Sequence, residues 1–340
     1  ASTAAYNFNT ALFFAKWLRD LAADQGDDGA VPFVIPDALV RADGKINSSA
    51  AWGDAAAIIP WTMYRAYGDK RFLEEQYPSM KAWVDYLTAE AGSSYLWKTG
   101  AHFGDWLGLD MEQFFTWQKF SVDSSTGATD KYFIASAFYA YSTELLVNAA
   151  DELNKTDDLK KYKRLYKKIV EAFKKEYITP NGRLVCETQT GMLLVLKFNL
   201  IDDKLRDNLG ERLVTNIKRH NMQMVTGFVG ASLLCPVLTE LGHHDIAGKL
   251  LLQTKYPSWL YPVTKGATTI WERWNGIKPD GEFEDPGMNS FNHYAYGAIG
   301  DWMYRKLLGI NEIVPGYKEI KINPMPISGM LFAEGSFETP

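Results

Sequence analysis

Apolar residues recur at intervals of three and four along most of the chain, which is the spacing of one face of an α-helix. In the segment 8–24 these positions are Ala11, Phe14, Leu18 and Leu21. In the segment 157–177 they are Leu159, Tyr162, Tyr166, Ile169 and Phe173. The pattern predicts about ten helices, near residues 8–24, 50–67, 70–91, 130–153, 157–177, 188–200, 203–220, 227–242, 244–254 and 290–309.

Three of the predicted long helices end in similar turns, at Gly68, Thr156 and Gly242. The turns are 88 and 86 residues apart, from 68 to 156 and from 156 to 242. A nearly constant period of two helical hairpins predicts a ring or solenoid of α-hairpins. Strand patterns are confined to short segments, at 183–186, 316–321 and 330–335. The expected fold is therefore all-α, with a β-structure beginning near the C-terminus.

Three connections are too long for a simple array of helices, at residues 25–49, 92–129 and 255–289. Loops longer than about 12–15 residues within a compact domain are usually functional or disordered. These connections are rich in Trp, Phe and Gly and contain single carboxylates among aromatic residues, which is not the composition of disordered segments. We expect them to form a binding face.

Composition narrows the classes of function. The 340 residues carry 36 Lys and Arg against 41 Asp and Glu, a formal net charge of −5, with no basic stripe that would favour a nucleic-acid partner. No apolar run of about 18 residues occurs, so no membrane span is expected. The two cysteines, Cys186 and Cys235, cannot build a disulfide framework, and the histidines lack metal-ligand spacing. We therefore expect neither a metal nor a cofactor.

Aromatic residues make up 14% of the chain and include 11 tryptophans. Most aromatic side chains belong to hydrophobic cores, although so many indoles also suit a protein that stacks sugar rings. The lysine-rich segment 160–168 keeps its apolar residues on one stripe, so its charges are interpreted as the solvated face of a helix.

The strongest local signal for chemistry is Glu272, in the segment TTIWERW at 268–274. Trp271 and Trp274 flank it, and a carboxylate among indoles is partly removed from water, which suits acid–base catalysis. The alternative is an ion pair between Glu272 and Arg273. Adjacent residues of an extended segment point in opposite directions, which weakens that alternative.

A second candidate is His293, in the segment NSFNHYAYG at 289–297. Ser290 is expected to cap the following helix, which would place His293 in its first turn. The positive end of a helix disfavours the imidazolium, so a neutral histidine able to hydrogen-bond a hydroxyl is predicted. A histidine whose hydrogen bonds are satisfied within the scaffold remains the alternative.

Two further segments, AWGDA and FGDWLGLD, place an indole within a few positions of a carboxylate. The residues concerned are Trp52, Asp54, Asp105, Trp106 and Asp110. A sugar site combines a flat apolar surface for one face of the ring with charged acceptors for the hydroxyl groups. Asp54 could equally be a favourable charge in a first helical turn, and Trp52 could belong to the core.

Together TTIWERW, GMNSFNHYAYGAIGDWMYRKLLGI, AWGDA and FGDWL resemble the bacterial and fungal α-L-rhamnosidases of glycoside hydrolase family 78. The resemblance runs over essentially the whole chain and is most specific in 255–310. It implies an (α/α)6 barrel, a six-hairpin toroid, over residues 1–310, followed by the beginning of a C-terminal β-sandwich at 311–340. It also implies inverting hydrolysis of terminal α-L-rhamnose from a rhamnose-containing glycoside or polysaccharide.

The resemblance also assigns roles to individual residues. Glu272 matches the general base that activates water, and His293 matches a histidine that binds the sugar. Trp52 and Trp106 resemble the tryptophans that wall the rhamnose pocket, and Asp105 is assigned to substrate binding by adjacency.

One part of the family pattern is missing. Its general acid is a glutamate in an Asp-Glu-Arg…Gly-Trp…Gly-Asp segment, which is expected just before residue 1. We therefore expect this chain to be a piece of a longer protein, with a barrel that lacks its first segment and little or no hydrolysis on its own. The residues alone would suggest Asp105 or Asp110 as the general acid that works with Glu272. We follow the family pattern, which places the general acid elsewhere.

Two other readings stay open at this point. Another (α/α)6 glycosidase, such as a glucosidase, a trehalase-like enzyme or a uronyl hydrolase, would keep the fold and change the sugar. A non-catalytic sugar-binding toroid would need Trp52 and Trp106 but not Glu272. The aglycone, a calcium requirement, the cellular compartment and assembly as a homodimer are not determined by the sequence.

Overall fold

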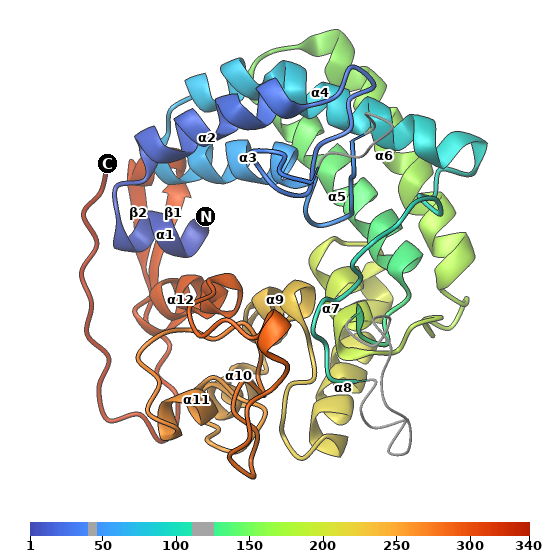
Figure 1. Cartoon of the computed structure of the whole chain (residues 1–340). Coiled ribbons are helices and arrows are strands. Elements are labelled where there is room, and N and C mark those ends of the chain that lie inside the picture. The colour runs from blue at the N-terminus through green and yellow to red at the C-terminus, as the bar shows by residue number, and fades with distance from the viewer. Residues whose placement is uncertain (40–45, 111–125) are drawn as a thin grey trace.

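The computed structural model describes residues 1–39, 46–110 and 126–340, so that parts of two predicted connections, 40–45 and 111–125, lie outside the described residues. Figure 1 shows the helices arranged as a ring. The helices are α1 (Ser2–Asn7), α2 (Ala11–Asp24), α3 (Ala55–Tyr67), α4 (Arg71–Ala91), α5 (Lys131–Glu152), α6 (Thr156–Tyr177), α7 (Gln189–Lys197), α8 (Asp203–Arg219), α9 (Phe228–Glu240), α10 (His244–Leu251), α11 (Leu260–Thr264) and α12 (Ile299–Trp302). Short 3-10 or π turns are η1 (Gly92–Ser94), η3 (Pro286–Met288), η4 (Ala295–Ala298), η5 (Met303–Leu307) and η6 (Pro315–Tyr317), and the strands are β1 (Ile310–Val314) and β2 (Glu319–Ile322).

The ring has an inner and an outer layer. Helices that follow one another in the sequence pack as hairpins, α3 with α4, α5 with α6, α7 with α8 and α9 with α10. The first member of each hairpin also contacts the first member of the next, and α1 lies between α3 and α12. This arrangement confirms the all-α ring of hairpins that the repeated turns predict.

The two layers differ in how their helices are buried. The inner helix α5 is buried along most of its length, whereas the outer helix α6 buries one stripe, formed by Tyr162, Ile169, Phe173 and Tyr177. The lysines of 160–168 are exposed on the other side of α6, as predicted. In the described part of the chain no helix has the length and apolar character needed to cross a membrane.

The helix predicted over 290–309 is wrong at its start. Helical structure begins only at Ala295, with η4, and continues through α12 into the π turn η5. Residues 290–293, which precede this helical structure, pair instead with the backbone of residues 270–272. The Glu272 N–H donates to the Ser290 carbonyl, and the His293 N–H donates to the Ile270 carbonyl. Ser290 therefore does not cap this helix, and His293 lies in the preceding loop.

The strand predictions are partly correct. β1 and β2 form an antiparallel hairpin in which Ile310 is opposite Ile322. The segment 183–186 contributes a single bridge, between Leu184 and Ile178, and 330–335 is not a strand. The adjacent Leu331 and Phe332 in that segment are 97% and 79% exposed, so the segment does not bury the apolar face expected of a strand in a sheet.

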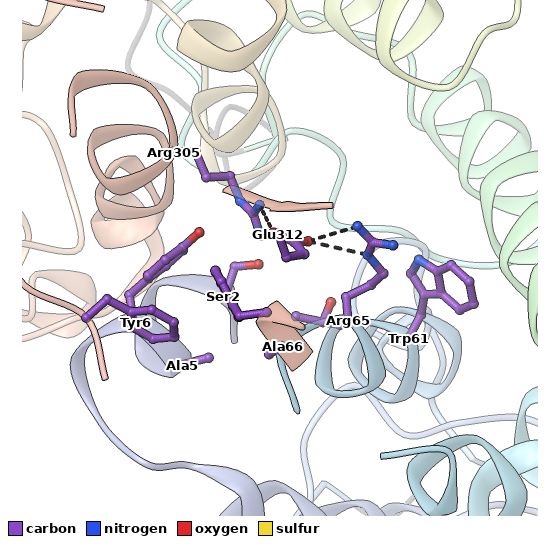
Figure 2. Close-up of a pocket in the computed structure, with 11 residues that line it drawn as sticks. Ser2, Ala5, Tyr6, Trp61, Arg65, Ala66, Arg305 and Glu312 are labelled. Atoms are coloured by element: carbon purple, nitrogen blue, oxygen red, sulfur yellow. Dashed lines mark hydrogen bonds and ion pairs between the residues drawn. The ribbon is translucent and has the colours of Figure 1, made fainter. Parts of the chain in front are cut away.

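Elements from near both ends of the chain meet at a partly buried ionic cluster. Glu312 on β1 accepts hydrogen bonds from Arg65 of α3 and from Arg305, and Arg305 also pairs with Asp301. Figure 2 shows Glu312 between the two guanidinium groups, with Tyr6 of α1 beside them. A cavity of about 110 Å³ lies here, and none of the residues that line it belongs to the predicted sugar site.

Candidate active site

Glu272 is held by the paired segments 270–272 and 290–293. Its Oε2 atom accepts a hydrogen bond of 2.8 Å from the Ser290 N–H, and its own N–H donates to the Ser290 carbonyl, also at 2.8 Å. The His293 N–H donates to the Ile270 carbonyl at 2.8 Å. The side chain is half-buried, and among the described residues its Oε1 atom has no hydrogen-bond partner. The carboxylate is thus fixed at one oxygen and available at the other.

The indoles beside Glu272 anchor this segment in the core. Trp274 is buried, stacks on Tyr296 with 3.8 Å between ring centroids, and donates from Nε1 to the Thr226 carbonyl. Trp271 is buried against Phe291. An alternative to the catalytic interpretation was an ion pair with the neighbouring arginine, and no such pair occurs among the described residues.

His293 lies beside Glu272, and its ring contacts two aromatic rings. The ring centroids of Phe228 and Tyr294 are 5.0 and 5.2 Å away. Nδ1 accepts a hydrogen bond of 3.3 Å from the Ala295 N–H, which leaves the proton of a neutral imidazole on Nε2. Burial lowers the pKa of His293, and the nearby Glu272 charge opposes that change. The predicted neutral histidine therefore results from burial and from this backbone donor, and not from a helix N-terminus.

Trp52 and Trp106 both pack on Phe103, a residue that the sequence analysis missed. The centroid distances from Phe103 are 4.8 Å to Trp52 and 5.4 Å to Trp106, and Phe33 makes a T-shaped contact with Phe103 at 5.0 Å. All four rings are half-buried. Phe103 lies in the same FGDWL segment as Trp106, and this proximity in the sequence could have identified it as part of the site. The tryptophans are thus joined through a third aromatic ring.

Two hydrogen bonds join the loops that carry these rings. The Ala50 N–H donates to His102 Nδ1 at 3.1 Å, and the Phe103 N–H donates to Ser49 Oγ at 3.2 Å. The other nitrogen of His102, Nε2, lies 2.9 Å from the Thr99 carbonyl. Burial lowers the pKa of His102 to about 4, so the ring is neutral near pH 7. His102 is a second histidine that sequence reasoning did not select.

The aspartates of the two segments belong to the scaffold. Asp54 is fully buried and accepts hydrogen bonds from Trp83 Nε1, Ser142 Oγ and the Ala51 N–H. Asp110 is also buried, and its Oδ1 accepts from the Ala128 N–H at 2.7 Å.

Asp105 is likewise fully buried, and its predicted contact with substrate is not supported by this geometry. Its oxygens accept hydrogen bonds from the Thr190 hydroxyl and from three backbone N–H groups of residues 227, 229 and 230. An aspartate without exposed surface and with four donors around it has no acceptor left for a sugar hydroxyl.

A chain of contacts links the aromatic cluster with Glu272 and His293. The Trp106 carbonyl accepts from the Phe228 N–H at 2.9 Å, and the Phe228 ring packs on His293. Each of the three long connections thus contributes to one region: Phe33 from the first, Trp106 from the second and Glu272 from the third. Within the described residues no group of His, Cys, Asp or Glu side chains could hold a metal ion.

Known proteins are similar to this chain in sequence and in fold. Residues 1–307 match the family model described as the bacterial alpha-L-rhamnosidase 6 hairpin glycosidase domain. An α-L-rhamnosidase of Streptomyces avermitilis is 41% identical over 338 residues, which are 99% of this chain and 30% of that protein. One from Formosa agariphila is 38% identical over 340 residues, covering 99% of this chain and 35% of that protein.

Solved structures agree with the sequence comparison. The Streptomyces avermitilis α-L-rhamnosidase in complex with L-rhamnose superposes with a TM-score of 0.87 at 41% identity, over 96% of this chain and 30% of that one. The native Aspergillus terreus enzyme gives a TM-score of 0.88 at 34% identity, over 96% and 37%. The chain therefore spans about a third of the length of these relatives. By sequence and by fold, it belongs to the family of bacterial α-L-rhamnosidase six-hairpin glycosidase domains.

Proposed function

We propose that this chain is the barrel of an inverting glycoside hydrolase that releases terminal α-L-rhamnose, with Glu272 as its general base. The observation that carries the proposal is the state of the Glu272 carboxylate, fixed at Oε2 by the Ser290 N–H, unpartnered at Oε1 and beside a neutral histidine. Membership of the rhamnosidase family supports the choice of sugar, since a relative of 41% identity has been solved with L-rhamnose.

In the proposed reaction, Glu272 takes a proton from a water molecule as that water attacks the anomeric carbon. The bond between this carbon and the leaving oxygen breaks, and a carboxylic acid on the opposite side protonates the oxygen. His293 donates its Nε2–H to a sugar hydroxyl. Trp52 and Trp106 supply flat apolar surface for a deoxysugar, which carries a methyl group where the parent hexose has a hydroxymethyl group.

The proposal requires a second carboxyl group about 6.5–9.5 Å from the base. Asp54 and Asp105 cannot serve, because both are fully buried and saturated with donors. We place the acid in polypeptide outside these 340 residues, since the relatives are about three times as long.

The resemblance to these longer relatives also suggests how the chain divides into domains. Residues 1–310 belong to the barrel in this proposal, and 311–340 begin a β-sandwich. The exposed Ile313, Ile320 and Ile322 on the terminal hairpin support that assignment, because further strands would bury them.

The test is a panel of aryl glycosides given to the complete polypeptide that carries these residues, with the anomer first released read by NMR. The proposal predicts hydrolysis of the α-L-rhamnoside and initial release of β-L-rhamnose. The 340-residue chain alone is expected to bind L-rhamnose and to hydrolyse little. Preference for another glycoside, or initial release of the α-anomer, would contradict the proposal.

A further inference from the structure

We propose that Asp105 is a positioning residue that caps helix α9 from a distant loop and thereby fixes Trp106 relative to Phe228, whose ring packs on His293. The cap itself is inferred from the geometry of α9. Its effect on sugar binding rests on the proposed function.

The cap itself is visible in the hydrogen bonds at the start of α9. The first N–H groups of a helix have no partner within the helix, and a side chain at the N-cap position usually accepts from them. The N-cap residue of α9 is Gly227, which has no side chain. Asp105 takes that role: Oδ1 accepts from the Val229 and Gly230 N–H groups at 2.9 and 3.1 Å, and Oδ2 accepts from the Gly227 N–H at 2.8 Å.

The carbonyl of the next residue completes the set. The Phe228 N–H donates to the Trp106 carbonyl at 2.9 Å, so the dipeptide Asp105–Trp106 satisfies four consecutive N–H groups. The carboxylate also faces the positive end of the helix, which favours its negative charge. The Thr190 hydroxyl donates to the remaining position on Oδ2.

No residue with its own capping side chain can replace Gly227. A Cβ atom at this position would lie 2.2 Å from the Trp106 carbonyl oxygen and 2.5 Å from that of Asp105. The loop that carries Asp105 and Trp106 can therefore approach α9 this closely only if residue 227 is glycine. Because glycine has no side chain, the capping acceptor must come from another residue, which is Asp105.

This joint positions groups of the candidate active site. Phe228 is the first residue of α9, and its ring packs on His293 and on Tyr296. The Trp106 ring packs on Phe103. If the cap is lost, Trp106 and His293 are no longer held in register, although neither side chain has been altered.

The test compares Asp105→Asn with a control in the same helix, Thr239→Val. The asparagine amide would place a donor against the N–H groups of α9. The Thr239 hydroxyl, near the other end of α9, accepts from Trp302 Nε1 and lies 3.1 Å from His244 Nδ1, so its loss removes side-chain contacts of α9 without touching the cap. Thr190→Val, which removes one donor of the set, is a milder variant that remains informative if Asp105→Asn does not fold.

Two measurements on the 340-residue chain are needed, L-rhamnose affinity by calorimetry and hydrogen exchange of the amides at 227–230. We expect Asp105→Asn to weaken binding by about tenfold and to accelerate exchange at 227–230, Thr190→Val to do both to a smaller extent, and Thr239→Val to do neither. Unchanged affinity in Asp105→Asn, or an equal loss in Thr239→Val, would overturn the inference. So would weakened binding with unchanged exchange, which would indicate direct contact with the sugar.

Failure of the proposed function gives a different result. If the unaltered chain does not bind L-rhamnose, the assignment of the sugar is wrong. The hydrogen-exchange measurement then still tests whether Asp105 caps α9. Amides at 227–230 that stay protected in Asp105→Asn would show that it does not.

Discussion

Glu272 and Ser290 exchange two hydrogen bonds of 2.8 Å, one from each backbone N–H, and the acceptor for the Ser290 N–H is the Glu272 side chain. The candidate base is thus oriented by main chain and not by a neighbouring side chain. Ser290 is an exposed loop residue and supplies the contact through its backbone.

The first prediction separates the backbone of Ser290 from its side chain. Ser290→Pro removes the N–H that orients Glu272, and we expect kcat on an aryl α-L-rhamnoside to fall by about 10²-fold. Ser290→Ala keeps that N–H and loses only the Oγ contact with the Asn292 N–H, so its loss should be much smaller. Equal losses in the two variants would show that the backbone bond does not position the base.

The second prediction concerns acid stability and His102. Burial lowers its pKa to about 4 from an ordinary value of 6.5, so between these pH values the unfolded chain binds a proton that the folded chain does not. The stabilisation is therefore present above pH 6.5 and is lost as the pH falls, by an amount on the order of 3 kcal/mol.

Urea unfolding of the unaltered chain and of His102→Asn at pH 7 and pH 4 measures this contribution. Asparagine keeps an acceptor for the Ala50 N–H but does not titrate. The free energy of unfolding of the variant should therefore decrease less between the two pH values. The same decrease in both proteins would exclude His102 as the source.

The third prediction concerns the ionic cluster where the chain ends meet. Glu312 has only 5% of its side chain exposed and pairs with both Arg65 and Arg305. We expect Glu312→Ala to reduce the free energy of unfolding by about 2–3 kcal/mol, because two partly buried guanidinium groups lose their partner.

A matched control is the exposed pair of Arg19 and Glu75, whose side chains are 64% and 47% exposed. Glu75→Ala should cost less than about 1 kcal/mol. Similar losses on chemical denaturation of the two variants would mean that the buried cluster is not a significant joint of the ring.

The fourth prediction concerns the ring between the two tryptophans. Phe103→Ala removes the surface on which Trp52 and Trp106 both pack, and L-rhamnose affinity should fall. Phe133→Ala, which removes a phenylalanine buried between α5 and α6, is the control for general loss of packing. If the control weakens binding as much as Phe103→Ala does, Phe103 has no specific role in the site.

The helices could be predicted because their pattern is local. In α6 the residues Ile169 and Phe173 repeat at helical spacing, and the structure buries both. Gly68, at the first repeated turn, ends α3 in the left-handed conformation that favours glycine. Such signals need no knowledge of the rest of the chain.

The errors arise where partners are distant in the sequence. Adjacency to Trp106 predicts that Asp105 binds substrate, whereas its hydrogen-bond donors lie 85 to 125 positions away. Local sequence predicts that Ser290 caps a helix, whereas pairing with Glu272, 18 positions away, prevails over local helix formation. No pattern around either residue indicates these contacts, because they depend on how the ring closes.

The central claim is that Glu272 activates the attacking water, and replacement of this residue in the complete polypeptide tests it most directly. Glu272→Gln should lower kcat on an aryl α-L-rhamnoside by about 10³-fold while L-rhamnose affinity stays within a few-fold. Azide added to Glu272→Ala should restore turnover and yield β-L-rhamnosyl azide, because a small anionic nucleophile needs no base. Near-normal turnover in Glu272→Gln would contradict the account.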